Sequence, residues 1–306
     1  MPLLPEQPNE AFAALLADPR SALRKLPPTV PLSALRDGAN AFMASASGPV
    51  VYSVEEYSIT GPECDVPIRI YRPDATVILP VVLYVHGGGF LLGSLDSHDS
   101  LCRSLALGSS AAVIAIDYRL APETRFPAPL QDITAVFHGL AGMASMLGLD
   151  MERCAIAGDS AGGQLAAAAA LDLPVRHLGL LYPMIDPSCS SASQIEYGEG
   201  YMLTRSFVEW AWEMYGRAGA NRRDPRFDLR RADPRHLPPT TIITAACDPL
   251  RDEAEAFADW LIQCDVDTRV QRFSGMIHGF AGMPQLTGQA GAAIAIVASR
   301  IKESLA

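Results

Sequence analysis

The sequence predicts an α/β protein with a mostly parallel, eight-stranded sheet that is flanked by helices. Two observations support this prediction. From residue 79 onward, short apolar runs alternate with segments of helical spacing, which is typical of parallel strands joined by crossover helices. Several of the runs are continuously apolar, as expected of strands buried on both faces. A chain of 306 residues, 49% hydrophobic and 19% charged, can bury such a core.

The elements follow in chain order. Residues 50–60 and 66–73 resemble two strands around a Gly-Pro turn and predict an antiparallel start to the sheet. The β-branched and apolar runs predict the remaining strands over 79–86, 111–118, 154–158, 177–183, 240–247 and 268–274. Helical spacing predicts helices over 97–108, 129–147, 161–171, 252–264 and 286–305.

Two parts of the chain depart from this alternation. Residues 1–48 are expected to form short helices that are broken by Pro27, Pro28 and Pro31. Residues 184–238 contain no clear strand, but they hold an aromatic helix and an Arg/Asp/Pro-rich loop. We expect these two parts to form a cap over one end of the sheet. The predicted organisation is therefore N-terminal cap helices (1–48), a first core part (49–183), a cap insertion (184–238) and a second core part (239–306).

Charge and composition restrict the function. The net charge is −10 and the chain has no basic tract, which argues against nucleic acid or an anionic membrane as the main partner. The N-terminal residues lack the pattern of a signal peptide, and no run of about 18 apolar residues occurs, so a cytoplasmic location is expected. The six cysteines form no C-x-x-C pair and are expected to be buried, reduced thiols.

A serine stands between glycines in the sequence Gly158-Asp-Ser-Ala-Gly162. The pentapeptide alone is a weak signal, but here it follows an expected strand and opens an expected helix, which is the setting of a nucleophile elbow. The turn is too tight for side chains at the two glycine positions. Ser160 is therefore predicted to project above the carboxyl end of the sheet, beside a helix N-terminus that favours negative charge.

A second glycine motif, His86-Gly87-Gly88-Gly89-Phe90, directly follows the central strand. Successive glycines allow main-chain N–H groups to point at one spot, as an oxyanion hole requires. The candidate donors are Gly87, Gly88 and Gly89, together with the N–H of Ala161.

The serine needs a base and an acid. Of the six histidines, His278 comes just after the last expected strand and therefore lies at the same end of the sheet as Ser160. Asp248 ends the preceding strand, and Pro249 stops that strand from continuing. Asp252 and Glu253 fall in the first turn of the next helix, where acids are common for other reasons. The chain order Ser160, Asp248, His278 is the order expected of an α/β-hydrolase.

These motifs resemble the bacterial hormone-sensitive-lipase-like esterases, which are cytoplasmic α/β-hydrolases with a helical cap. The resemblance rests on HGGGF, DYRLAPETRFPAPLQD, GDSAGG, DPLRDE and HGF, and it runs from about residue 50 to about 300. It implies that Ser160 is the nucleophile, Asp248 the acid and His278 the base, with Gly88, Gly89 and Ala161 as oxyanion donors. It also implies hydrolysis of short- to medium-chain carboxylic esters, no metal, no cofactor and the capacity to form a homodimer.

The sequence departs from the family in two places. Only residues 172–176 join the expected helix over 161–171 to the next strand, which indicates a trimmed connection. The loop DPRFDLRRAD lacks the Ser-Pro-Leu that usually follows its Asp-Pro-Arg. This difference affects the expected position of the cap on the core and therefore the expected substrate preference.

Further residues near the motifs are expected to act structurally. Asp159 is expected to order the elbow by hydrogen bonding, and Glu123, Arg125 and Pro127 to fix loops under the site. The cap aromatics have two interpretations, core packing or a substrate-binding wall, and they are Phe207, Trp210, Trp212 and Tyr215.

Other functions use the same residues. The constellation also serves hydrolases of lactones, amides or carbamates, and acyltransferases in which an alcohol replaces water. A small-molecule receptor without catalysis is a further alternative, although such receptors usually lose the histidine that this sequence retains.

Overall fold

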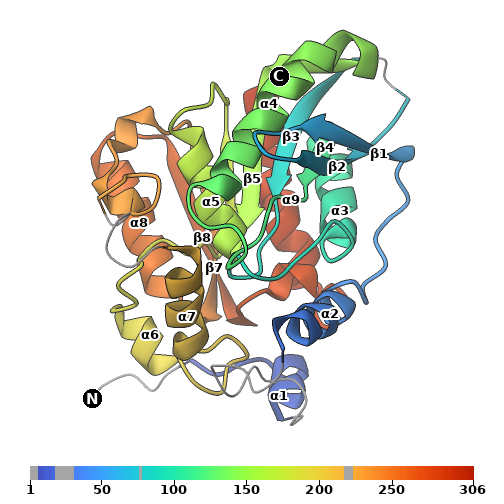
Figure 1. Cartoon of the computed structure of the whole chain (residues 1–306). Helices are drawn as coiled ribbons and strands as arrows, with labels where there is room; N and C mark the ends of the chain where they lie inside the picture. Colours follow the sequence, from blue (N-terminus) through green and yellow to red (C-terminus); the bar gives the residue numbers. More distant parts are fainter. Residues whose placement is uncertain (1–5, 18–30, 76–77, 217–222) are drawn as a thin grey trace.

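A single eight-stranded sheet runs through the molecule in the order β1-β2-β4-β3-β5-β6-β7-β8 (Figure 1). The computed structural model describes residues 6–17, 31–75, 78–216 and 223–306. The expected helix stops at prolines 27 and 28 lie outside these residues. β1 and β2 are antiparallel to their neighbours, and the other strands are parallel. The strands are β1 Ser53–Thr60, β2 Asp65–Arg72, β3 Leu79–Val85, β4 Ala112–Ile116, β5 Leu149–Asp159, β6 Leu178–Leu181, β7 Thr240–Cys247 and β8 Thr268–Ile277. The predicted fold class is confirmed.

Helices cover both faces of the sheet. α4, α5 and α8 pack on one face, and α3 and α9 pack on the other, each face with its own apolar core. The helices are α1 Glu10–Ala17, α2 Leu32–Met43, α3 Asp99–Ser109, α4 Ala128–Leu147, α5 Ser160–Ala170, α6 Ala192–Glu196, α7 Arg205–Tyr215, α8 Arg251–Gln263 and α9 Gln289–Leu305. Among the described residues, none of the helices combines the length and the hydrophobicity that a membrane span requires.

The central strand β3 explains why the apolar runs are continuous. Its residues Val81, Leu83 and Val85 belong to the core under α4 and α5. The alternate residues Val82 and Tyr84 belong to the core under α3 and α9. Because successive side chains of a strand point to opposite faces, a strand covered on both faces needs apolar residues at every position.

Two strands are longer than predicted. β5 begins at Leu149, which pairs with Leu79 ahead of an irregularity in β3, and the polar residues that follow Leu149 hide this start in the sequence. β8 continues to Ile277 because a register shift after Ala245 brings Ile277 opposite Cys247. The longer β8 carries the chain directly to position 278.

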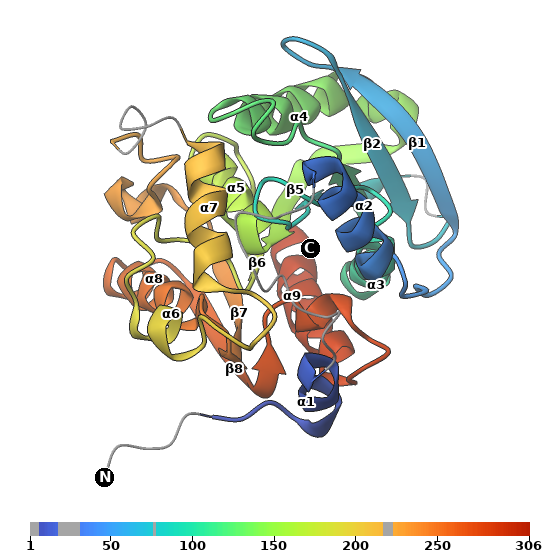
Figure 2. The ribbon, with the colours of Figure 1, turned by 60° about the horizontal axis from the view of Figure 1, so that its bottom comes forward.

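The strand order creates a switch point beside β3. β4 lies on one side of β3 and β5 on the other, so the connections after β3 and β5 leave in different directions. In open α/β sheets, ligands bind where such a reversal occurs, outside the carboxyl ends of the strands. Figure 2 shows α1, α2, α6 and α7 lying across this end of the sheet.

The six cysteines are all described and carry free thiols. Four are buried, as predicted, whereas Cys64 is exposed and Cys264 is half-buried. Cys64 lies in the turn between β1 and β2 and Cys264 just after α8, where neither packing layer covers them.

Candidate active site

The predicted nucleophile stands at the junction of β5 and α5. Ser160 has a φ of +53°, a left-handed conformation that is uncommon for a residue with a side chain. A Cβ atom at Gly162 would collide with the carbonyl oxygens of Val85 and His86, and one at Gly158 would collide with the main chain of Gly162. The two glycines therefore allow the close approach that holds Ser160 in this turn.

A continuous chain of hydrogen bonds joins the three residues that the sequence predicts as a triad. His278 Nε2 lies 2.9 Å from Ser160 Oγ, and His278 Nδ1 lies 2.8 Å from Asp248 Oδ2. A carboxylate only accepts, so Nδ1 carries the proton and Nε2 presents its lone pair to the serine hydroxyl. The side chains come from the ends of β5, β7 and β8, and all three residues are buried.

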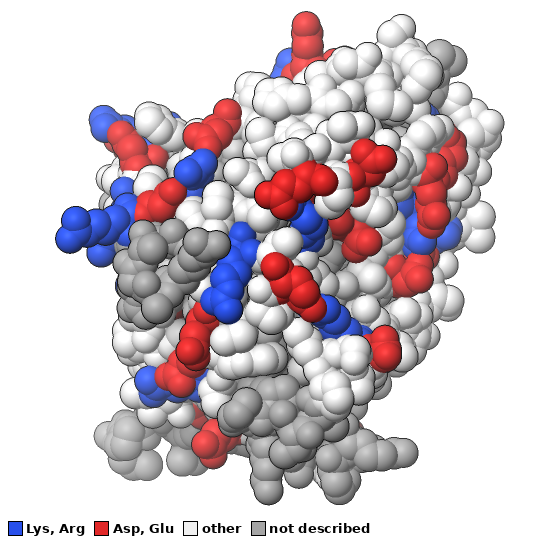
Figure 3. Space-filling view, viewed as in Figure 1, with Lys and Arg blue, Asp and Glu red and all other residues white. Residues whose placement is uncertain are grey.

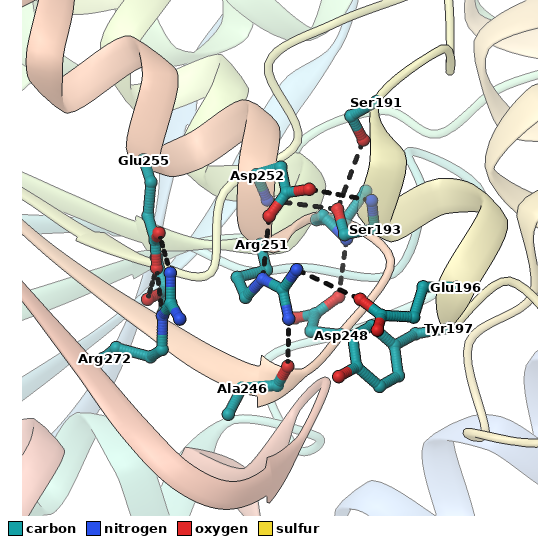
Figure 4. Close-up of polar contacts among 12 residues, drawn as sticks. Ser191, Ser193, Glu196, Tyr197, Ala246, Asp248, Arg251, Asp252, Glu255 and Arg272 are labelled. Atoms are coloured by element: carbon teal, nitrogen blue, oxygen red, sulfur yellow. Dashed lines mark hydrogen bonds and ion pairs between the residues drawn. The ribbon is translucent and has the colours of Figure 1, made fainter. Parts of the chain in front are cut away.

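The loop that carries Asp248 is braced by Ser193 and Glu196 of the predicted cap insertion (Figure 4). Asp248 Oδ1 accepts from the N–H of Leu250 at 2.8 Å, and Ser193 Oγ of α6 donates to the carbonyl oxygen of Pro249 at 2.7 Å. Arg251 donates to Ala246 O at 3.0 Å and to Glu196 at 3.2 Å.

The two rival acids both bond to residues of the predicted cap insertion and not to His278. Asp252 Oδ2 accepts from the N–H of Ser193 at 2.8 Å. Glu253 Oε1 accepts from the N–H of Ile185 at 2.8 Å, and burial raises the pKa of this carboxyl to about 8. The geometry therefore leaves Asp248 as the carboxylate that faces the histidine.

The glycine loop after β3 places two main-chain donors at the cavity. Gly88 and Gly89 have φ values of +118° and +63°, and both line the cavity together with Ser160. Within the described ranges, neither of their N–H groups donates to a protein acceptor. Ala161 lies in the first turn of α5, where N–H groups have no intrahelical acceptor.

The structure corrects the prediction for Gly87. Its N–H donates to Asp159 Oδ1 at 2.8 Å and is therefore not available to an oxyanion. The same oxygen accepts from the hydroxyl of Tyr84 at 2.7 Å, and His98 Nε2 lies 3.2 Å away. Burial opposes the charged form of Asp159, but His98, Tyr84 and the Gly87 N–H together lower the pKa of its carboxyl. Asp159 thus joins the elbow to the glycine loop by hydrogen bonds.

His86 begins the glycine motif but does not face the serine. Its ring stacks on Tyr118 with the centroids 4.4 Å apart, and its Nδ1 lies 2.8 Å from Gly87 O. Burial lowers the pKa of His86 to about 4, so the ring is neutral at pH 7.

A cavity of about 450 Å³ opens above Ser160 and His278. α2 contributes one wall, including Leu35 and Phe42, and the segment before α7 contributes Met202 and Leu203. The wall is mostly apolar, and such a volume suits a small organic molecule. Residues 1–48 and 184–238 therefore both contribute described side chains to the cavity.

The cap aromatics divide between the two predicted roles. Phe207 lines the cavity and contacts Gly89. Tyr215 instead stacks on Phe90 with the centroids 4.0 Å apart, and Trp212 packs against Phe90 at 5.2 Å, in a buried apolar core.

Sequence reasoning assigned no role to His98 or Tyr182. His98 lines the cavity, and the Tyr182 ring packs edge-on against the His278 ring at 4.9 Å. His98 lies 61 residues from Asp159 in the chain, and no local pattern marks this contact. Tyr182 is the next-to-last residue of the strand predicted over 177–183, and this position is the signal that could have placed it at this end of the sheet.

The distribution of charged side chains on the surface is consistent with a site for a small molecule. On the face in Figure 3, basic side chains of the described residues lie among acidic ones and form no broad basic patch. Ion pairs also neutralise individual basic side chains, and Arg36 pairs with Glu123 at 2.7 Å.

Known proteins share this sequence and architecture. A family model described as "alpha/beta hydrolase fold" matches residues 82–282. The chain belongs to the α/β-hydrolase family. An ethyl acetate hydrolase from Pseudomonas putida is 37% identical over 250 residues, which are 78% of this chain and 79% of that protein. An arylesterase from Saccharolobus solfataricus is 35% identical over 232 residues, which are 74% of this chain and 76% of that protein.

A solved structure is similar to nearly the whole length of this α/β-hydrolase chain. An ester hydrolase from the metagenome of Lake Arreo, in complex with a derivative of bipyridine phosphonate, has a TM-score of 0.90 and 36% identity. The match covers 97% of this chain and 99% of that one. These comparisons confirm the predicted hormone-sensitive-lipase-like family, the fold and the enzyme class, which is that of a carboxylic ester hydrolase.

Proposed function

We propose that this α/β-hydrolase is a serine carboxylesterase that hydrolyses short- to medium-chain carboxylic esters through an acyl-serine intermediate. The observation that carries the proposal is the hydrogen-bonded chain from Ser160 through His278 to Asp248, at 2.9 and 2.8 Å, beside the free N–H groups of Gly88 and Gly89. A serine, a histidine and an acid in this order activate the serine for attack on a carbonyl carbon.

Acylation is the first half of the reaction. His278 Nε2 takes the hydroxyl proton as Ser160 Oγ bonds to the ester carbonyl carbon. The carbonyl oxygen becomes an oxyanion that accepts hydrogen bonds from Gly88, Gly89 and Ala161, and losing one such donor typically costs about 10²–10³ in rate. Asp248 stabilises the imidazolium. The carbon–alkoxy bond then breaks, and the alcohol leaves with the proton from His278.

Deacylation repeats these steps with water. His278 removes a proton from the water as its oxygen attacks the acyl carbon, and the same N–H groups hold the second oxyanion. The bond to Ser160 Oγ breaks, the serine regains its proton from His278, and the carboxylic acid leaves.

The cap supports the proposed range of substrates. The predicted cap regions, 1–48 and 184–238, contribute described residues to a cavity of about 450 Å³ with mostly apolar walls. Such a cavity accommodates a neutral acyl or alcohol group of limited length. The names of the relatives, an ethyl acetate hydrolase and an arylesterase, support small esters as the substrate class.

The test is hydrolysis of p-nitrophenyl esters from C2 to C12 by the wild type and by Ser160→Ala. We expect the highest kcat/KM among the short esters and a loss of about 10³-fold or more in the variant. A fluorophosphonate probe should label the wild type at Ser160. Wild-type turnover by Ser160→Ala would disprove the proposal.

Further substrates separate the alternatives. Higher kcat/KM on a lactone, amide or carbamate would assign a different bond, and ester products formed from added alcohols would indicate an acyltransferase. A peak at long chains with activation at an oil interface would indicate a lipase. The homodimer and the cytoplasmic location stay predictions, and sedimentation of the purified protein tests the first.

A further inference from the structure

A second histidine lies beside the nucleophile and takes no part in the proposed mechanism. His98 precedes α3, is only 7% exposed and lines the same cavity as Ser160 and His278. Its Nε2 lies 3.2 Å from Asp159 Oδ1 and 3.3 Å from Oδ2, and its Nδ1 lies 2.8 Å from Ser97 Oγ.

The hydrogen bonds around His98 indicate which of its nitrogens carry protons. Asp159 accepts from Tyr84 and Gly87, and these contacts favour its charged form. A carboxylate cannot donate, so the Nε2 of His98 must do so. Ser97 Oγ lies 2.7 Å from the carbonyl oxygen of Ser94, which uses the single hydroxyl hydrogen of Ser97. Ser97 Oγ therefore accepts from Nδ1, and both ring nitrogens are donors.

A charged His98 has a clear consequence for catalysis. Asp159 directly precedes Ser160 and is 7% exposed, so its negative charge lies in a region of low dielectric near the developing oxyanion. Two negative charges in such a region repel each other strongly. An imidazolium in contact with Asp159 neutralises this charge, while Asp159 keeps the Gly87 N–H and hence the glycine loop in place.

We propose that His98 is a positioning residue, held as an imidazolium against Asp159, and that the pair neutralises the carboxylate beside the nucleophile and fixes the oxyanion loop. The catalytic part rests on the proposed function, whereas the charge state of His98 does not.

The other titratable groups near the pair do not supply this charge. Burial raises the pKa of Tyr84 and of Cys102 well above their ordinary values and lowers the pKa of His86 to about 4, so all three are neutral at pH 7. Asp99, the next residue after His98, is paired with Arg103 at 2.6 Å. Among the described residues, His98 is the basic group within ion-pair distance of Asp159.

The first test is ¹⁵N NMR of the full chain labelled at its six histidines. The His98 signal is identified by its absence in His98→Gln, or by through-bond correlation to its own backbone if that variant fails to fold. We expect both ring nitrogens to be protonated at pH 7 in the wild type, and the ring to become neutral in Asp159→Asn. A neutral His98 in the wild type would overturn the proposal.

The second test is a double-mutant cycle with kcat and KM measured separately. Gln can still donate to Asp159 but leaves its charge unpaired, so His98→Gln should lower kcat by about tenfold, less than the 10²–10³ for a lost oxyanion donor. KM should change by less than about twofold. Removing both charges in His98→Gln/Asp159→Asn should restore most of kcat. Additive losses in the double variant would indicate simple packing and refute the charge argument.

Controls keep the two proposals apart. His138→Gln, on an exposed position of α4, should leave kcat and KM unchanged. If the wild type neither hydrolyses esters nor reacts with a fluorophosphonate, the proposed function fails, while the NMR result still decides the state of His98. If the wild type is active and His98→Gln has the same kcat, the inference about His98 is refuted, whereas the proposed function stands.

Discussion

Ser193 and Asp252 are joined by two reciprocal hydrogen bonds. The N–H of Ser193 donates to Oδ2 of Asp252 at 2.8 Å, and the N–H of Asp252 donates to Oγ of Ser193 at 3.1 Å (Figure 4). The hydroxyl also donates to Pro249 O, directly after Asp248. α6, in the predicted cap insertion, is thus bonded to the loop that carries the proposed catalytic acid.

Removal of this hydroxyl should weaken both stability and catalysis. Ser193 is fully buried, so Ser193→Ala leaves two main-chain groups unsatisfied, and urea unfolding should show a loss of about 1–3 kcal/mol. We expect kcat to fall about threefold to tenfold, less than the 10²-fold that a 1 Å misplacement can cost. Ser190→Ala, at an exposed position, is the control and should stay within about 0.5 kcal/mol. Equal effects of the two substitutions would contradict the role of Ser193.

Stability should depend on pH through Glu253. Burial raises the pKa of Glu253 from 4.5 to about 8, so between these values the folded chain retains a proton that the unfolded chain releases. The free energy of unfolding should therefore fall as pH rises from about 5 to 8, by at most about 1.4 kcal/mol per pH unit from this group. Glu253→Gln keeps an acceptor for Ile185 and should flatten this slope in urea unfolding at several pH values. An unchanged slope would show that Glu253 ionises normally.

Substrate affinity should depend on how α2 is anchored. Arg36 donates to Leu91 O at 2.7 Å and to Ala121 O at 2.9 Å, and it pairs with Glu123. α2 lines the cavity but holds no proposed reacting group, so Arg36→Met should raise KM about threefold or more with kcat nearly unchanged. Arg153→Met, which breaks an ion pair with Asp150 near the start of β5, serves as control. A fall in kcat with constant KM would be inconsistent with this role.

Chain-length preference should depend on Phe207. Its ring fills the space beside Gly89 at the cavity wall, so Phe207→Leu should enlarge the cavity. We expect the ratio of kcat/KM for C8 over C4 esters to rise by about tenfold, since each fitted methylene contributes about 1 kcal/mol. Trp210→Phe, on the same helix but outside the cavity lining, should leave the ratio unchanged. If Phe207→Leu and Trp210→Phe gave the same C8-to-C4 ratio of kcat/KM, the acyl chain would not bind beside Phe207.

Local sequence patterns were sufficient to predict most of the sheet and the end of the sheet at which the candidate site lies. Continuous apolar strands and spaced helices predict the sheet, and its parallel topology brings Ser160, Asp248 and His278 to one end. That inference works because the carboxyl ends of parallel strands share an edge, whatever the details of side-chain packing.

Side-chain directions and distant contacts could not be predicted. Gly87 looks the same as its neighbours in the sequence, but in the structure its N–H is taken by Asp159. His98 and Asp159 meet through tertiary packing, in which α3 lies against β2 and β4, and no spacing rule encodes that pairing. The start of β5 was missed because the residues that follow Leu149 are mostly polar and because an irregularity in β3 interrupts the pairing of the two strands.

The bond between Ser160 and His278 spans 118 positions of the chain. β6, the cap insertion, β7 and α8 all lie between the two residues, and β8 must join the sheet edge before the imidazole reaches the hydroxyl. During synthesis the serine turn leaves the ribosome long before its base. The serine hydroxyl can therefore be activated only after the chain has been made through His278, and products that stop before β8 are expected to be chemically inert.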